Sequence, residues 1–398
     1  MQKAGPRVAV VVGDFPRLSE TFIISQICGL LDAGITVTVF ADARDENGLS
    51  HPLLKSHDLM SDARFAGDHP LYRLANALPR PYRLIMAMKL LATDRTDAGL
   101  ADDFDVVLCH FGVNGLRALR ANHRNKVKGQ IWTAFHGYDL NAHFQDQTRA
   151  RYRDLFREGD LLLPACESFK TQLIGYGAPP DRIWVHRMGV DVTLIRPRRT
   201  EGDNGDGIRI ISVGRLVEKK GLEFAIRALR RVRQQHPEID WTYEIAGDGP
   251  TRLQLQALAA DLQIADRVRF SGALPHSQIL DAVSQSDIFL LPSVTARNGD
   301  VEASPVAISE AMASGLPIIA TRHSGIPEIV THNKNGLLAA ERDVEELAQH
   351  LTTLMGDGGM RQSFGREGRR FVEERLDNRM LHKVLAERIA TVARGRTR

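Results

Sequence analysis

Cysteine and long hydrophobic runs are both scarce in this sequence of 398 residues. The three cysteines, Cys28, Cys109 and Cys166, are scattered without the spacing of a metal site, so a disulfide-stapled secreted framework is not expected. No stretch approaches the ~18–20 apolar residues that a membrane span needs. The first apolar run, residues 8–12, is too short for a signal peptide. We therefore expect a cytoplasmic protein.

Strong charge of one sign is missing as well. Lysine and arginine total 52 against 49 acidic residues, and a net charge of +3 does not indicate a nucleic-acid partner. The hydrophobic fraction of 43% is ordinary for a soluble globular protein. Because 398 residues exceed what one core usually supports, we predict two domains.

Short apolar strands alternate with amphipathic helices throughout the chain. In the first half we predict strands at 7–12, 35–40, 105–109, 131–135 and 160–163, and helices at 20–31, 112–119, 146–156 and 168–174. In the second half we predict strands at 208–213, 241–246, 267–271, 287–291 and 317–320, and helices at 222–235, 251–262, 276–284, 305–314 and 343–355. This α/β alternation predicts two doubly wound, Rossmann-like domains with parallel sheets facing a cleft.

The polar, glycine-containing segment 196–207 between the two series is the predicted linker. It separates an N-terminal domain at 1–195 from a C-terminal domain at 208–375. The string "FVEERLDNRMLHKVLAERIATVA" near the end predicts one further helix, with residues 376–398 free to cross back to the first domain.

Unusual residues gather at the predicted carboxyl ends of strands, where open parallel sheets bind ligands. Gly13, His136 and the pair Gly214-Arg215 each follow a strand directly, and Glu302 lies in the loop after strand 287–291. A lone histidine at a strand end is usually a packed residue, so His136 gains weight only from this clustering. The clustering predicts a site at the cleft edge.

In the stretch "DVEASPVAISEAMASGLP", Glu302 and Glu310 flank the start of a predicted helix. Ser304 suits the N-cap and Pro305 the first helical position. A helix N-terminus favours a phosphate, and carboxylates on either side of it suggest hydroxyl recognition. Two ordinary solvent-facing glutamates explain the stretch equally well when it is taken alone.

The loop "VGRLVEKKG" places Arg215 after a strand and Lys220 before the next helix. Two cations near a helix N-terminus suit a diphosphate, although an exposed basic loop is the simpler alternative. A dinucleotide enzyme is disfavoured, because neither the loop after the first strand nor that after strand 208–213 has the G-x-G-x-x-G pattern.

Together, "GRLVEKKG", "IAGDGP", "LLPS", "EASPVAISE" and "EAMASGLPIIAT" followed by "GIPEIV" resemble the retaining glycosyltransferases of family 4, which have the GT-B fold. The resemblance is strong over residues 208–339 and weaker in the first domain, through "FHGYD" and "GVD". The string "FPRLSETFI" is similar to a subgroup that assembles bacterial exopolysaccharide or colanic-acid-type repeat units.

The resemblance implies a role for each candidate residue. Arg215, Lys220 and Gly214 would hold the donor diphosphate, Glu310 the ribose, and Glu302 with Ala303, Ser304, Pro305 and Val306 the donor sugar and its phosphate. His136 would lie under the sugar from the opposite domain, so that His136 and Glu302 are the candidate catalytic residues. Gly13, Ser19 and Glu20 would form the acceptor-side loop. The family is usually metal-independent, so no metal and no cofactor are expected.

Two departures from the family pattern fall on the acceptor half. The first loop contains only Gly13 where relatives carry paired glycines, and Met188 replaces the asparagine of the usual "NGVD". We expect a transferase that moves a hexose, with retention, from a UDP- or GDP-linked donor to a glycan or polyprenyl-linked saccharide. The alternatives are a sugar-nucleotide epimerase or phosphorylase of the same fold, and a catalytically idle partner protein.

The stretch between Arg64 and Arg95 mixes apolar residues with Arg80, Arg83 and Lys89. Basic residues beside an apolar helix face suit an interfacial helix on anionic lipid, and an ordinary core helix is the alternative. We expect peripheral contact with the inner face of the cell membrane.

Overall fold

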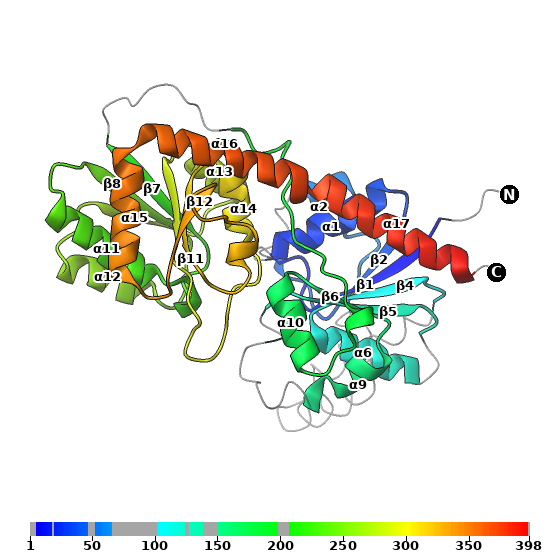
Figure 1. Cartoon of the computed structure of the whole chain (residues 1–398). Coiled ribbons are helices and arrows are strands. Elements are labelled where there is room, and N and C mark those ends of the chain that lie inside the picture. The colour runs from blue at the N-terminus through cyan, green and yellow to red at the C-terminus, as the bar shows by residue number, and fades with distance from the viewer. Residues whose placement is uncertain are drawn as a thin grey trace, which may run out of the picture.

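The structure, a computed structural model, describes residues 5–17, 20–46, 52–65, 102–123, 127–137, 140, 150–197 and 207–396. The chain forms two domains, each built on a six-stranded parallel sheet flanked by helices (Figure 1). The predicted fold class, two doubly wound domains, is confirmed.

The first sheet has the strand order β3-β2-β1-β4-β5-β6. Its strands are β1 (Arg7–Val11), β2 (Thr36–Ala41), β3 (Arg64–Phe65), β4 (Val106–His110), β5 (Gln130–Phe135) and β6 (Leu161–Pro164). The helices of this domain are α1 (Thr21–Asp32), α2 (Pro52–Ser56), α6 (Gly112–His123), α9 (Arg153–Glu158) and α10 (Glu167–Gly175), with a 3₁₀ turn η4 at Pro180–Arg182. Strand β1 is central and almost wholly buried, as its continuous apolar sequence indicates.

The second sheet has the order β12-β11-β10-β7-β8-β9. Its strands are β7 (Ile208–Val213), β8 (Trp241–Ala246), β9 (Val268–Gly272), β10 (Ile288–Leu291), β11 (Ile318–Thr321) and β12 (Gly336–Ala339). The helices are α11 (Leu222–Gln235), α12 (Arg252–Asp261), α13 (His276–Ser284), α14 (Val306–Ala313), α15 (Val344–Gly356) and α16 (Gly358–Arg375), with 3₁₀ turns η5 (Glu218–Lys220) and η6 (Ile326–Glu328). Helix α11 buries Leu222, Ile226 and Leu229 on one stripe, at the spacing that predicted it.

Several elements were missed or displaced in the prediction. Strands β3 and β12 were not predicted, and β3 has only two residues. Helix α16 carries glycines and many charges that obscure its periodicity. The predicted helix 146–156 begins outside the described residues, and α9 covers only Arg153–Glu158. Most of the predicted linker, residues 198–206, also lies outside them.

The string predicted as one helix near the C-terminus is divided, because its first residues end α16 and the rest forms a separate helix α17 (Asn378–Arg396), close to the predicted range 376–398. The segment around Val190, which precedes the linker, is hydrogen-bonded at the break between α16 and α17. The N–H of Val190 donates to the carbonyl of Leu376, and the N–H of Asn378 donates to the carbonyl of Val190. These bonds take the place of helical ones, so the chain turns at Asp377.

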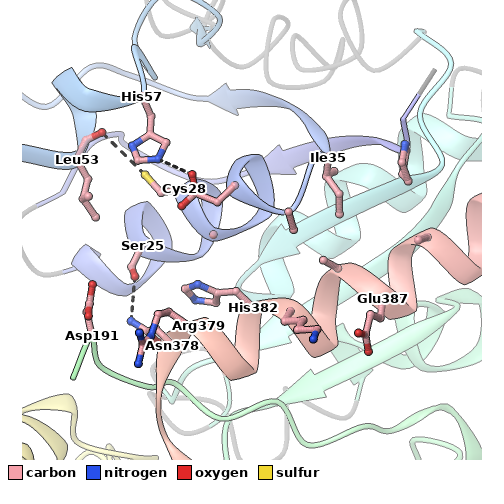
Figure 2. Close-up of a pocket in the computed structure, with 17 residues that line it drawn as sticks. Ser25, Cys28, Ile35, Leu53, His57, Asp191, Asn378, Arg379, His382 and Glu387 are labelled. Carbon is pink, nitrogen blue, oxygen red and sulfur yellow. Dashed lines mark hydrogen bonds and ion pairs between the residues drawn. The ribbon is translucent and has the colours of Figure 1, made fainter. Parts of the chain in front are cut away.

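Helix α17 lies on the first domain, against α1 (Figure 1, red). Leu385, Ala386 and Ile389 belong to the apolar core that also contains β1 and α1. Asn378 Nδ2 donates to Ser25 Oγ at 2.9 Å where the two helices meet (Figure 2). A cavity of about 580 Å³ remains between them, beside Cys28 and His382. Burial raises the pKa of the Cys28 thiol to about 12, so this sulfur stays protonated and unreactive.

Candidate functional site

A cavity of about 660 Å³ lies between the two domains, at the carboxyl ends of both sheets. Six of the predicted site residues line it: Gly13, Glu20 and His136 from the first domain, and Arg215, Lys220 and Glu302 from the second. The strand-end positions thus predicted correctly that Gly13, His136, Arg215 and Glu302 lie together, whereas Glu20 and Lys220 were predicted from the loop motif and the family resemblance. Lys219 and Met188 line the same cavity, although only Met188 was singled out in the sequence.

Glu302 is the most strongly constrained charge in this cavity. Only 8% of the residue is exposed, and burial by itself would raise the pKa of its carboxyl. Lys220 Nζ lies 3.0 Å and Lys219 Nζ 4.0 Å from Glu302 Oε1, and their charges bring the pKa down to about 2. Glu302 is therefore ionised at every physiological pH.

The two lysines are held differently. Lys219 Nζ also donates to Asp300 Oδ1 at 3.1 Å and to the carbonyl of Val301 at 3.2 Å, so it is anchored to the loop that carries Glu302. The stem of Lys220 lies over Gly214, where an added Cβ would be 3.1 Å from Lys220 Cε. Gly214 has φ +147, so glycine fits both the backbone and the close approach of the lysine.

The backbone of Glu302 is fixed by a buried relay. Its N–H donates to His323 Nε2 at 3.0 Å, and His323 Nδ1 lies 2.6 Å from Glu341 Oε1. Glu341 in turn accepts the N–H of Thr295 at 2.8 Å. Because Nε2 accepts, the neutral His323 ring carries its proton on Nδ1 and donates it to Glu341. The relay holds the Glu302 loop from the side of β11.

Glu310 lies on α14, outside the lining of the cavity, with its Oε1 2.7 Å from His276 Nε2. That hydrogen bond raises the pKa of His276. The predicted start of this helix is wrong by one residue, because Pro305 has ψ 110 and α14 begins at Val306. Ser304 is buried and makes no capping bond, whereas Ala303 and Pro305 are buried beside it and Val306 is half-buried.

His136 follows β5 and is hydrogen-bonded through Nε2 to His110 Nδ1 at 2.9 Å. The planes of the two rings are nearly parallel, with an interplanar angle of 15°. Burial is the main cause that lowers the pKa of His110, to about 3, and that of His136 well below its usual value. The first domain therefore presents a neutral imidazole to the cavity.

Two arginine–carboxylate pairs also line the first-domain wall, beside aromatic residues that include Phe22, Phe111 and Tyr152. Arg117 Nη1 donates to Asp42 Oδ2 at 2.6 Å, and Arg17 Nη1 lies 3.4 Å from Glu20 Oε1. Burial raises the pKa of Glu20 despite the opposing charge of Arg17. Gly13, whose carbonyl accepts the N–H of Asp42, adjoins this wall, and Ser19 lies outside the described residues.

Four residues of the site were missed in the sequence: Lys219, His110, His276 and His323. His110 ends β4 as His136 follows β5, so the same strand-end signal was available. Lys219 adjoins Lys220, and spacing alone does not show that both side chains turn to Glu302. The partners of His276 and His323 are distant in sequence and gave no local signal.

Within the described ranges, no group of three metal-ligating side chains is arranged to hold an ion. No helix of the described part of the chain is long and apolar enough to span a bilayer.

Both halves of the chain match known protein families. Residues 19–194 match Glycosyltransferase Family 4, and residues 196–371 match Glycosyl transferases group 1. WcaL of Salmonella typhimurium, a putative colanic acid biosynthesis glycosyltransferase, is 33% identical over 97% of this chain and 100% of its own length. This chain belongs to the family 4 glycosyltransferases.

The glycosyltransferase is also similar to the amylovoran biosynthesis glycosyltransferase AmsK of Erwinia amylovora, which is 34% identical over 85% of this chain and 88% of that protein. Among solved structures, HepE of Anabaena in complex with UDP and glucose has a TM-score of 0.75 and 19% identity, covering 97% of this chain and 100% of that one. At this identity the likeness concerns the fold.

Replacing Lys219 with methionine is expected to raise the pKa of Glu302 above about 2, because one of two lysine attractions is lost while burial remains. A lowered carboxyl pKa stabilises the fold above the ordinary value near 4.5 and ceases to do so as pH falls through about 2. The carboxyl carbon of Glu302 can be followed by ¹³C NMR between about pH 6 and 3, with its signal assigned by comparison with Glu302→Gln. It should begin to titrate at a higher pH in Lys219→Met than in the wild type.

Lys334→Met removes an exposed lysine of the same domain and serves as the control. The assignment of Lys219 fails if Lys219→Met and this control titrate alike.

Proposed function

We propose that this glycosyltransferase moves a hexose from a UDP- or GDP-linked donor to a glycan or lipid-linked glycan acceptor in exopolysaccharide assembly, with retention. The observation that carries the proposal is the buried, ionised Glu302 with Lys219 and Lys220, facing the neutral His136 across one cavity. The names of WcaL and AmsK support the polysaccharide context. Retention rests on the family resemblance.

In the proposed donor site, Lys220 and Arg215 bind the diphosphate. Arg215 is exposed at the cavity edge and forms no ion pair with any residue that the structure describes. A bound diphosphate competes with Glu302 for Lys220, while Asp300 keeps Lys219 in place beside Glu302. Preorganised cations of this kind stabilise the charge that develops on the leaving diphosphate.

The sugar lies between Glu302 and His136 in this proposal. Glu302 accepts hydrogen bonds from sugar hydroxyls, and the neutral imidazole of His136 approaches the ring from the first domain. Glu310 accepts the ribose hydroxyls, and the amides of Ala303 to Val306 adjoin the phosphate at the start of α14. The cations and helix amides take the place of a metal, so the proposed reaction needs none.

We assign the acceptor to the first-domain wall. Arg117 with Asp42 and Arg17 with Glu20 alternate donors and acceptors while their charges cancel. Paired groups of this kind suit the neutral, hydroxyl-rich surface of a glycan better than an isolated phosphate. Met188 adds an apolar contact in the same cavity, where family relatives carry asparagine.

Arg215→Ala and Lys220→Ala should each lower turnover by about 10²- to 10³-fold, because each removes a charge aimed at the leaving group. Release of UDP or GDP from a panel of nucleotide sugars, with and without acceptor, measures this loss. The melting temperature should change little for Arg215→Ala, whose side chain is exposed, and should fall for Lys220→Ala, because the buried Glu302 loses its nearer counter-charge.

Arg297→Ala, at a 92% exposed arginine of the same domain, is the matched control and should be fully active. Near-normal turnover in both cavity variants would remove Arg215 and Lys220 from the site. An epimerised donor without transfer would favour the epimerase alternative.

Glu310→Gln should weaken UDP or GDP binding by about tenfold, since ribose contacts are shared by ground and transition states. Glu302→Gln should instead reduce turnover more than affinity for the bare nucleoside diphosphate. Calorimetric titration and kinetics on both variants separate these effects. The roles are reversed if Glu302→Gln abolishes diphosphate binding while Glu310→Gln does not.

His276→Ala is the control for the ion pair on α14. It should weaken nucleotide binding less than Glu310→Gln does, because only the orientation of the carboxylate is lost.

We further propose salt-sensitive binding of the first domain to anionic membranes. The predicted interfacial stretch lies outside the described residues beyond Phe65, so the proposal rests on its sequence. Each cation near an anionic surface contributes about 1 kcal/mol. Charge reversal at Arg80, Arg83 and Lys89 should abolish sedimentation with phosphatidylserine vesicles at low salt, whereas reversal at Arg227, Arg231 and Arg269 of the second domain should not. Equal recovery of the wild type in the supernatant with and without vesicles would contradict it.

A further inference from the structure

A short segment of the second domain, residues 323–328, lies between the Glu302 loop (residues 300–305) and the first domain. Its inner side holds the loop. His323 Nε2 accepts the N–H of Glu302 at 3.0 Å, and Gly325 lies so close to Ala303 that an added Cβ would be 1.8 Å from the Ala303 carbonyl oxygen. Any shift of this segment therefore moves the loop.

The outer side of the segment binds the first domain through Glu328. The N–H groups of Glu167 and Ser168 donate to the two carboxylate oxygens of Glu328, each at 2.9 Å. Arg187 Nη2 donates to Glu328 Oε2 at 2.8 Å. All three donors lie in the first domain. Both oxygens of Glu328 are thus used across the domain boundary.

Helix α10 depends on this contact for its N-terminal cap. Its own N-cap residue, Cys166, has no side-chain capping bond, and Glu328 satisfies the first amides instead. A carboxylate at a helix N-terminus gains from the positive end of the helix dipole, and the arginine adds a charge-assisted bond. The first domain therefore recognises the ionised form of Glu328.

An apolar contact surrounds this polar one. Val301 and Ala303 of the Glu302 loop belong to the same buried cluster as Phe135, Cys166 and Phe169 of the first domain. A Cβ added at Gly325 would lie 3.0 Å from Cys166 Cβ. The loop is thus covered by the first domain in the arrangement that the structure shows.

We infer that Glu328 is a positioning residue that couples closure of the two domains to the placement of Glu302. The inference rests on the proposed function. Separation of the domains breaks all three bonds of Glu328 and removes the outer support of residues 323–328. Water then hydrates the freed carboxylate, guanidinium and amides. The net free energy of breaking this contact is therefore small, and the contact can form and break reversibly. Nucleotide binding uses the second domain alone, whereas transfer requires the closed cavity.

The full-length Glu328→Gln and Glu328→Ala variants test this role. Turnover of UDP-glucose or GDP-mannose, followed as release of UDP or GDP, should fall about tenfold or more, because the charge-assisted bonds are weakened or lost. The Kd for bare UDP or GDP should stay within about twofold and the melting temperature should be nearly unchanged. A loss of turnover without a loss of nucleotide affinity or melting temperature distinguishes a positioning role from a structural one.

Glu345→Gln is the matched control, because it removes the exposed ion pair of Glu345 with Arg231 within the second domain. It should leave turnover and binding unchanged. Arg187→Gln should lower turnover less than Glu328→Ala, and the double variant Glu328→Gln with Arg187→Gln should lose less than the sum of the two single losses.

Small-angle X-ray scattering gives a readout that does not depend on activity. Glu328→Ala should have a larger radius of gyration than the wild type with and without UDP or GDP. Unchanged turnover in both Glu328 variants, or parallel losses of turnover, nucleotide affinity and melting temperature, would overturn the inference. Absence of turnover in the wild type would contradict the proposed function instead, and the scattering comparison would still decide the role of Glu328 in closure.

Discussion

Glu302 is an ionised carboxylate that folding places at 8% exposure, and the surroundings of the cavity are built to keep it charged. Burying a lone carboxylate costs several kcal/mol, and removing one partner of a buried pair leaves much of that cost uncompensated. Lys219 and Lys220 supply the compensating charge from the loop after β7. His323 holds the backbone from the loop after β11. Three neighbouring strands of one parallel sheet, β7, β10 and β11, therefore support a single side chain.

The two walls of the cavity come from different domains and carry different charged groups. The second domain brings lysines and an arginine, which suit a diphosphate leaving group. The first domain brings neutral imidazoles at His110 and His136 and arginines already paired with carboxylates. In the proposed reaction, a hydroxyl-bearing acceptor meets these arginine–carboxylate pairs, and the negative charge that develops on the diphosphate meets the lysines. Helix α17 ties the two walls together, because it continues the second domain into the core of the first.

The sequence predicted those parts of the site that depend on one strand and the loop after it. Arg215 closely follows its strand, while Lys220 and Glu302 lie in the loops after theirs, and a parallel sheet brings such ends and loops to one edge. His110 carried the strand-end signal, but its pairing with His136 depends on the order of β4 and β5, which local periodicity does not give. His323 was missed because its partners, Glu302 and Glu341, lie in loops remote from it in sequence. The start of α14 was displaced because Pro305 keeps an extended ψ. The break at Asp377 depends on the crossing segment near Val190, which is remote in sequence.

The central claim is that a nucleotide sugar binds to Lys220 in the charged cavity and to Glu310 on α14, outside the lining of that cavity. The most direct measurement is the melting temperature of the wild type and of a Lys220→Ala, Glu310→Gln double variant against a panel of UDP- and GDP-sugars. A ligand at about 100 times its Kd stabilises a protein by about 2.7 kcal/mol, which is easily detected. The account predicts that sugars on one of the two nucleotides stabilise the wild type and leave the double variant unchanged. No stabilisation of the wild type by any of these sugars, or equal stabilisation of both proteins, would contradict it.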